Sequence, residues 1–164
     1  MLLVLDMGNT NITIGVYEGK KLLLQSRIAT DRTKMEDQYA VELMDLMRLY
    51  KLESAAFSGA IIASVVPPLN HAICGAGKKA VGVTPLLVGP GTKTGINIRI
   101  DNPSQLGADL LVGAVAAVDA VGYPCIVWDL GTATTVSVVD KDGSFRGGAI
   151  MPGIGTALNS LEDN

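Results

Sequence analysis

A short motif that occurs twice constrains this chain more than any other feature. Near the N-terminus an apolar run ends at Asp6, Gly8 follows two residues later, and a second apolar segment begins after it. The same order returns around Asp129 and Gly131. Because each copy has the pattern of a strand, an acidic turn and another strand, the sequence predicts two related halves that begin in the same way.

Each copy has the composition of a phosphate-binding turn. Glycine permits a tight turn whose backbone N–H groups can face an anion, and short hydroxyl and amide side chains add donors without bulk. The aspartate cannot contact a phosphate directly because like charges repel, so a cation or an ordered water is expected between them. Two such turns, facing each other, would hold the phosphates of a nucleotide. Aspartate before glycine is also common in ordinary turns, and this plainer interpretation applies to either copy taken alone.

The composition indicates a core of aliphatic residues. Hydrophobic residues make up 48% of the 164 residues and aromatic residues only 4%, which is typical of buried strands covered by alanine-rich helices. The net charge of −3 gives no basic surface for nucleic acid. The most apolar window, 110–128, is interrupted by a charge, a glycine and a proline, so no membrane span is expected.

Two further features favour a cytoplasmic protein. The apolar N-terminus has no basic flank and reaches Asp6 at once, which argues against a signal peptide. Cys74 and Cys125 do not form a disulfide framework, and we expect them to be small buried thiols in a reducing compartment.

The periodicity of apolar residues predicts the order of the elements. Strands are expected over 2–6, 12–16, 22–27, 60–66, 85–88, 96–100, 124–129, 135–140 and 144–150. Helices are expected over 36–50, 69–81 and 105–121. The face of the first helix that should be buried contains Tyr39, Leu43, Leu46, Met47 and Tyr50.

This order predicts a duplicated α/β fold with a cleft between its halves. The first half is expected over residues 1–104 and the second over residues 105–164. The second copy reaches only the start of a helix after Pro152, and a three-stranded sheet with one uncovered face is marginally stable. We therefore expect that the second half is truncated, or that another chain covers that face.

Four blocks, in order, give the sequence a resemblance to a known family. They are residues 6–10, residues 101–103 with 107–109, residues 129–134 and residues 147–153. With these blocks the chain resembles a type III pantothenate kinase over essentially its whole length. The resemblance implies membership of the acetate and sugar kinase, Hsc70 and actin superfamily, with ribonuclease H-like (actin-like ATPase) halves and mixed sheets. It also implies ATP-dependent phosphorylation of pantothenate, the first step of coenzyme A synthesis.

The resemblance implies roles for particular residues. The nucleotide phosphates would be bound on one side by Asp6, Met7, Gly8, Asn9, Thr10, Asn11, Ile12 and Thr13, and on the other by Thr132. Asp129 would hold a monovalent cation, potassium or ammonium, and Mg²⁺ would accompany ATP. Asp109 would be the general base, and the pantothenate pocket would be lined by Gly107, Ala108, Asp109 and Leu110. A homodimer is also implied, with the small-residue helix 111–117 as a candidate interface element.

Two features depart from the family pattern. The family motif reads Gly-Ala-Asp-Arg, and this chain has Leu110 at the arginine position, which cannot give a carboxylate the bidentate contacts of a guanidinium. Family members also continue well beyond residue 164.

These departures keep alternatives open. One is a nucleotide-binding regulator or degenerate kinase without turnover, and another is a superfamily kinase with a different small hydroxyl acceptor. For Asp109 the plainer interpretation is a carboxylate that favours the N-terminal end of a helix dipole.

Overall fold

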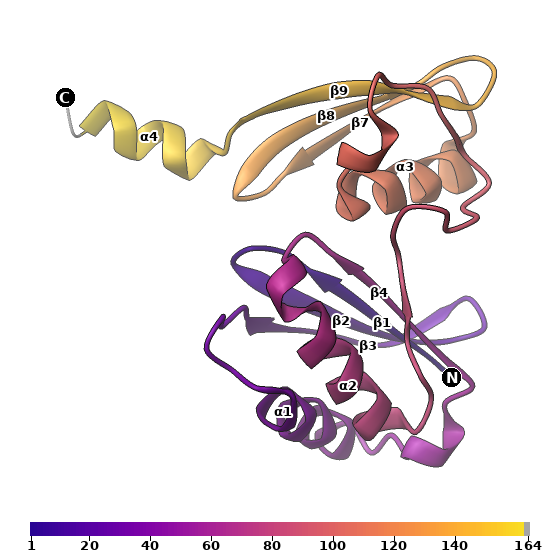
Figure 1. Cartoon of the computed structure of the whole chain (residues 1–164), viewed down its shortest axis with the longest axis vertical. Helices are drawn as coiled ribbons and strands as arrows, with labels where there is room; N and C mark the ends of the chain where they lie inside the picture. The colour runs from indigo at the N-terminus through magenta and orange to yellow at the C-terminus, as the bar shows by residue number, and fades with distance from the viewer. Residues whose placement is uncertain (163–164) are drawn as a thin grey trace. The chain divides into compact units, whose positions relative to one another are not determined.

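The computed structural model describes residues 1–162, and the chain divides into two compact units between Gly89 and Pro90 (Figure 1). The strands and helices of the first unit are β1 (Leu2–Met7), β2 (Asn11–Glu18), β3 (Lys21–Ala29), α1 (Glu36–Leu49), β4 (Gly59–Ser64), α2 (Asn70–Val81) and β5 (Leu86–Leu87). Those of the second are β6 (Asn97–Ile98), α3 (Ala108–Val121), β7 (Cys125–Leu130), β8 (Ala133–Val139), β9 (Ser144–Pro152) and α4 (Ile154–Glu162). Short 3₁₀ turns lie at Ser54–Ala56, Pro67–Leu69 and Pro103–Gln105.

The first unit is a mixed sheet with helices on one face. Its strand order is β3-β2-β1-β4-β5, with β1 antiparallel to β2 and parallel to β4. Every second side chain of β1 and β2 is fully buried, because α1 and α2 cover that face (Figure 1). Within the described residues, twenty buried side chains form this core.

Helix α1 shows where the sequence prediction succeeded and where it was wrong. Tyr39, Leu43 and Met47 are buried as expected, and Leu46 is half-buried. Tyr50 was expected on the same face, but it is 47% exposed. The helix ends at Leu49, so Tyr50 occupies the C-cap, where the backbone leaves the helical path and the side chain no longer follows the buried stripe.

The second unit has a smaller core. Its sheet has the order β6-β9-β8-β7, and α3 contacts β7 and β8. Among the described residues, Ala114, Val139 and Phe145 form its buried cluster. Helix α3 begins at Ala108 rather than at the predicted residue 105, because residues 103–105 form a 3₁₀ turn. On the other face of β7, Trp128 is 63% exposed.

The predicted duplication extends to the register of the strands. In the first unit Asp6 pairs with Thr13 across β1 and β2, and in the second unit Asp129 pairs with Thr135 across β7 and β8. The next pair of strands has a register shift in both units, between residues 16 and 17 and between residues 138 and 139. The two units therefore share a three-stranded antiparallel framework with equivalent positions.

The cysteines differ in part from expectation. Cys74 and Cys125 are free thiols, but both are half-buried rather than buried. Partial burial raises the pKa of the Cys74 thiol, because the thiolate would lose hydration there. In the part of the chain that the structure describes, no helix has the length and apolar character needed to cross a membrane.

Candidate functional site

The first Asp–Gly turn joins β1 to β2 and is held in place by the residue that follows β3. The Gly8 N–H donates to the Asn11 carbonyl at 2.9 Å, and a Cβ at Gly8 would lie 3.2 Å from that oxygen, which favours glycine. Thr30 donates its hydroxyl to the Gly8 carbonyl at 2.7 Å and its N–H to the Thr10 carbonyl at 2.9 Å. One of these hydrogen bonds lies within the turn and two come from Thr30, and together they stabilise its shape.

The side chains of this turn fall into two groups. The polar ones are at least partly open to solvent: Asp6, Asn9, Thr10, Asn11 and Thr13. Met7 and Ile12 are fully buried in the core, so only their backbone atoms could approach a nucleotide. Arg32 donates to the Asn9 side-chain oxygen at 3.0 Å, which places a guanidinium beside the turn.

A surface hollow of about 180 Å³ lies on the sheet face away from α1 and α2. Its lining includes Asp6 and Thr13, together with Val4, Ile14, Gly15, Tyr17, Leu22 and Gln25. Ligand pockets usually measure about 300 to 1,000 Å³. The hollow is therefore large enough for one chemical group of a ligand and too small for a whole nucleotide.

The second Asp–Gly turn closes in the same way as the first. The Gly131 N–H donates to the Ala133 carbonyl at 3.1 Å. Gly153 packs against this turn so closely that a Cβ there would lie 2.3 Å from the Thr132 carbonyl oxygen. Asp129 and Thr132 are both exposed at the surface.

This geometry corrects one part of the sequence interpretation. The turn N–H groups were expected to face an anion, but those of Gly8 and Gly131 donate within their own turns. Donors to an anion would therefore come from the neighbouring backbone groups and from the hydroxyl and amide side chains.

Asp109 occupies the first turn of α3. Gly107 is the N-cap residue, and the half-buried Asp109 carboxylate accepts a hydrogen bond from the Leu110 N–H at 2.8 Å. A negative charge at this position favours the helix dipole, as the plainer interpretation requires. The same contact holds one carboxylate oxygen in place, which a general base also needs.

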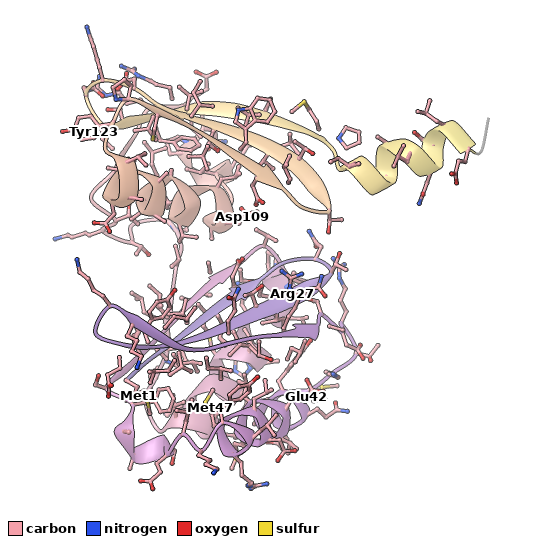
Figure 2. All side chains as sticks on the ribbon, turned by 180° about the vertical axis from the view of Figure 1, so that it is seen from behind. Met1, Arg27, Glu42, Met47, Asp109 and Tyr123 are labelled. Atoms are coloured by element: carbon pink, nitrogen blue, oxygen red, sulfur yellow. The ribbon has the colours of Figure 1, made fainter. Side chains whose placement is uncertain are left out.

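Asp109 and Asp129 lie toward the same end of the second unit. Tyr123, which follows α3 and precedes β7, lies in Figure 2 at the opposite end of the helix from Asp109. The N-terminal end of α3, where Figure 2 labels Asp109, therefore lies toward the end of β7. Asp129 is four residues beyond Cys125, so it shares the sheet face that α3 covers.

Leu110 contributes to packing at this end of the helix. It is half-buried and contacts the cluster of Ala114, Val139 and Phe145. A leucine side chain placed there offers no polar contact to a substrate. The backbone of residues 107–110 and the Asp109 carboxylate are the groups that could provide one.

The cation predicted at Asp129 would have few protein ligands. Over residues 1–162, no three side chains of histidine, cysteine, aspartate or glutamate gather as a metal-binding group. Hard cations such as Mg²⁺ commonly combine one or two carboxylates with water and substrate phosphates. Asp6 in the first unit and Asp129 in the second are each exposed, so each could supply one carboxylate ligand of this kind.

Comparison with known proteins identifies the family. The family model for type III pantothenate kinase matches residues 2–164. The chain belongs to the type III pantothenate kinase family. It is 45% identical over 161 residues to the type III pantothenate kinase of Listeria welshimeri, and equally identical to that of Halalkalibacterium halodurans. These alignments cover 98% of this chain but only 62% and 63% of the relatives, so the chain spans less than two thirds of their length.

Solved structures confirm the actin-like fold predicted from the resemblance. The ethanolamine utilization protein EutJ from Carboxydothermus hydrogenoformans has a TM-score of 0.51 at 17% identity, over 98% of this chain and 54% of its own. A putative 2-dehydro-3-deoxygalactonokinase from Sinorhizobium meliloti also has a TM-score of 0.51, at 12% identity, over 92% of this chain and 53% of its own. At such low identity the similarity concerns the fold alone.

Sequence reasoning missed two positions that the register adds to the site. Thr135 is the partner of Asp129, as Thr13 is of Asp6, and Arg27 pairs with Thr13 across β2 and β3. The signal was present in the alternation of the strands, because residues opposite each other in antiparallel strands share a face. The pairing itself depends on register, which the residue pattern alone does not fix.

Proposed function

We propose that this chain acts in the ATP-dependent phosphorylation of pantothenate to 4'-phosphopantothenate, the first step of coenzyme A biosynthesis. Its family membership supports the reaction, and the paired Asp–Gly turns support the nucleotide site. The observation with the most weight is that Asp6 and Asp129 occupy equivalent positions, each before a glycine-closed turn and each opposite a threonine.

The two turns bind the phosphates of ATP in this proposal. Residues 6–13 would contact them from one half and Thr132 from the other. The donors to these phosphates would be the exposed polar side chains of the first turn and the exposed Thr132.

Cations complete the site in this proposal. Mg²⁺ bound with ATP would offset charge on the phosphate oxygens, and Asp129 would hold potassium or ammonium. The two aspartates would keep these cations between carboxylate and phosphate, where direct contact would be repulsive.

Asp109 is the proposed general base. It takes the proton of the pantothenate primary hydroxyl as that oxygen forms a bond to the γ-phosphorus, and the bond to the β-phosphate oxygen breaks to release ADP. Its carboxylate is held by the Leu110 N–H at 2.8 Å, so it is oriented before substrate binds. Residues 107–110 line the pantothenate pocket, and their backbone provides the polar contacts that Leu110 does not. We further propose that the protein is a cytoplasmic homodimer.

The test compares Asp109→Asn with Asp119→Asn. Both substitutions remove one carboxylate from α3, and Asp119 is exposed near the other end of the same helix. Product formation from ATP and pantothenate, with Mg²⁺ and potassium present, is measured by mass spectrometry. Asp109→Asn should lower kcat by about 10² to 10⁴ and Asp119→Asn should leave it unchanged.

Three results would reject parts of the proposal. Equal turnover by Asp109→Asn and the unsubstituted chain would remove Asp109 as the base. Calorimetric binding of ATP without phosphorylation of pantothenate would favour the non-catalytic nucleotide-binding alternative, and phosphorylation of a different small alcohol would favour another acceptor.

A further inference from the structure

The outer face of the first sheet has a row of three side chains across neighbouring strands. Asp6 on β1 pairs with Thr13 on β2, and Thr13 pairs with Arg27 on β3. Residues paired in antiparallel strands point to the same face, so the three side chains share one side of the sheet. Asp6 and Arg27 are exposed and Thr13 is half-buried, while the adjacent row of Met7, Ile12 and Ile28 points into the core.

Figure 2 agrees with this assignment. Arg27 lies on the side of the sheet away from Glu42 and Met47, which are on α1. The hollow of about 180 Å³ opens on the Arg27 side, with Asp6 and Thr13 among its lining residues. Two members of the row, Asp6 and Thr13, therefore line the hollow beside the first Asp–Gly turn, and Arg27 is the next residue along the row.

Arg27 is the positively charged member of this row, and it can offset the repulsion between Asp6 and an anion bound there. Thr13 lies between Asp6 on one neighbouring strand and Arg27 on the other, and the backbones of adjacent strands are about 5 Å apart. Among the described residues, no ion pair or hydrogen bond engages the Arg27 side chain. By contrast, Lys34 is paired with Glu42, and Arg32 donates to Asn9. Arg27 is thus the cation in this row that is available to an external ligand.

The duplication provides an internal comparison. The equivalent row of the second unit consists of Asp129, Thr135 and Ile150. It has the same carboxylate and hydroxyl, but its third member is an apolar side chain that is 71% exposed. The cation is therefore a particular feature of the first row and does not follow from the repeated framework.

We propose that Arg27 is a binding residue for the phosphate groups of the nucleotide, acting with the Thr13 hydroxyl on the same row. This inference rests on the proposed function, since it assigns one more contact to that site. A guanidinium donates paired, charge-assisted hydrogen bonds to phosphate oxygens, and it offsets the repulsion between those oxygens and Asp6.

The experiment uses a ligand series and matched variants. The 164-residue chain and its Arg27→Gln, Arg27→Lys and Arg48→Gln variants are titrated with adenosine, ADP and ATP by calorimetry in the presence of Mg²⁺. Arg48 is the control, because it is an exposed arginine of the same unit on α1, where it pairs with Asp45. Thermal melting confirms that each variant is folded.

The expected pattern depends on phosphate number. Arg27→Gln should weaken ATP binding about 10- to 100-fold, as expected for loss of a charge-assisted hydrogen bond, and leave adenosine within about twofold. Arg27→Lys should recover part of the loss, and Arg48→Gln should bind like the unsubstituted chain. The role of Arg27 is overturned if Arg27→Gln matches Arg48→Gln, or if it weakens adenosine and ATP equally.

A separate outcome concerns the acceptor. If Arg27→Gln raises KM for pantothenate and leaves ATP affinity unchanged, the guanidinium contacts the acceptor and the phosphate assignment is wrong. Failure of the unsubstituted chain to bind ATP would reject the proposed function itself, which distinguishes that failure from an error about Arg27.

Discussion

The two units use the same three-stranded framework for different kinds of surface. Two residues before each aspartate, on the same face of the sheet, lies another row of paired residues. In the first unit it consists of Val4, Gly15 and Gln25, and in the second of Val127, Ser137 and Gly148. In the first unit this row lines a hollow, and in the second Ser137 is buried on the face that α3 covers. A repeated motif therefore fixes the turn and the register, and the residues around it decide whether the face stays open.

The hydrophobic cores of the two units also differ in size. Within residues 1–162, the first core has twenty buried members and the second has three. Because burial of apolar surface is the dominant stabilising term, we expect the second unit to depend more heavily on each of its few core contacts.

The largest expected effect on stability distinguishes Gly148 from Gly15, two glycines that lie on strands in these rows. A Cβ at Gly148 would lie 1.8 Å from the Val136 carbonyl oxygen, whereas a Cβ at Gly15 would lie 3.4 Å from its nearest neighbour. Gly148→Ala must force β8 and β9 apart and should cost about 3 kcal/mol or more of unfolding free energy. Gly15→Ala should change it by less than about 1 kcal/mol. Urea titration followed by circular dichroism, with fluorescence of Trp128 for the second unit, measures both. Similar losses for the two variants would show that the rows are not packed differently.

The next effect compares two aromatic residues of the second sheet. Phe145 is 1% exposed in the small core, and Trp128 is 63% exposed on the other face of the sheet. Phe145→Ala should destabilise the unit by about 3 to 5 kcal/mol. Trp128→Ala should cost less than about 1 kcal/mol, as for most surface positions. Hydrogen exchange of β8 and β9 amides is the measurement. A larger effect of Trp128→Ala would mean that its face is packed in solution.

The elements themselves could be predicted from sequence, because alternation and turn residues are local signals. The alternation of apolar residues over 12–16 anticipates β2, and the hairpin that follows turns at Gly19, which has φ of 58°. The prediction was wrong for Tyr50, because the end of α1 depends on capping rather than on periodicity.

The candidate site was only partly accessible from sequence. The Asp–Gly turns could be recognised because they are contiguous, and Arg27 and Thr135 could not, because their relation to the aspartates depends on strand register. The small size of the second core was also hidden, since apolar composition does not say which face of a sheet is covered.

The smallest effect concerns one aspartate in each unit. The pKa of Asp140 is strongly lowered by hydrogen bonding with the Asp142 side chain, by the Arg146 guanidinium and by the backbone N–H groups of Asp142 and Ser144. The Thr33 hydroxyl and N–H lower the pKa of Asp31, at 2.7 and 2.9 Å. A carboxyl whose folded pKa is depressed contributes stability above its unfolded value of about 3.9, and this contribution is lost as pH falls through the folded value.

Carboxyl ¹³C NMR titration checks this prediction. Both groups should titrate below the ordinary aspartate range, with the larger displacement at Asp140, and Arg146→Gln should return the pKa of Asp140 toward its ordinary value. A midpoint for Asp140 at or above the ordinary value would contradict the hydrogen-bond arrangement of the 140–146 hairpin.

The central claim is that the two Asp–Gly turns bind one nucleotide. Hydrogen exchange measured by mass spectrometry during a titration with Mg²⁺ and ATP tests it most directly, because it follows both turns in the same sample. We predict that peptides covering residues 6–13 and 129–135 gain protection together, with one common midpoint. Protection of one turn without the other, or two separate midpoints, would contradict the claim.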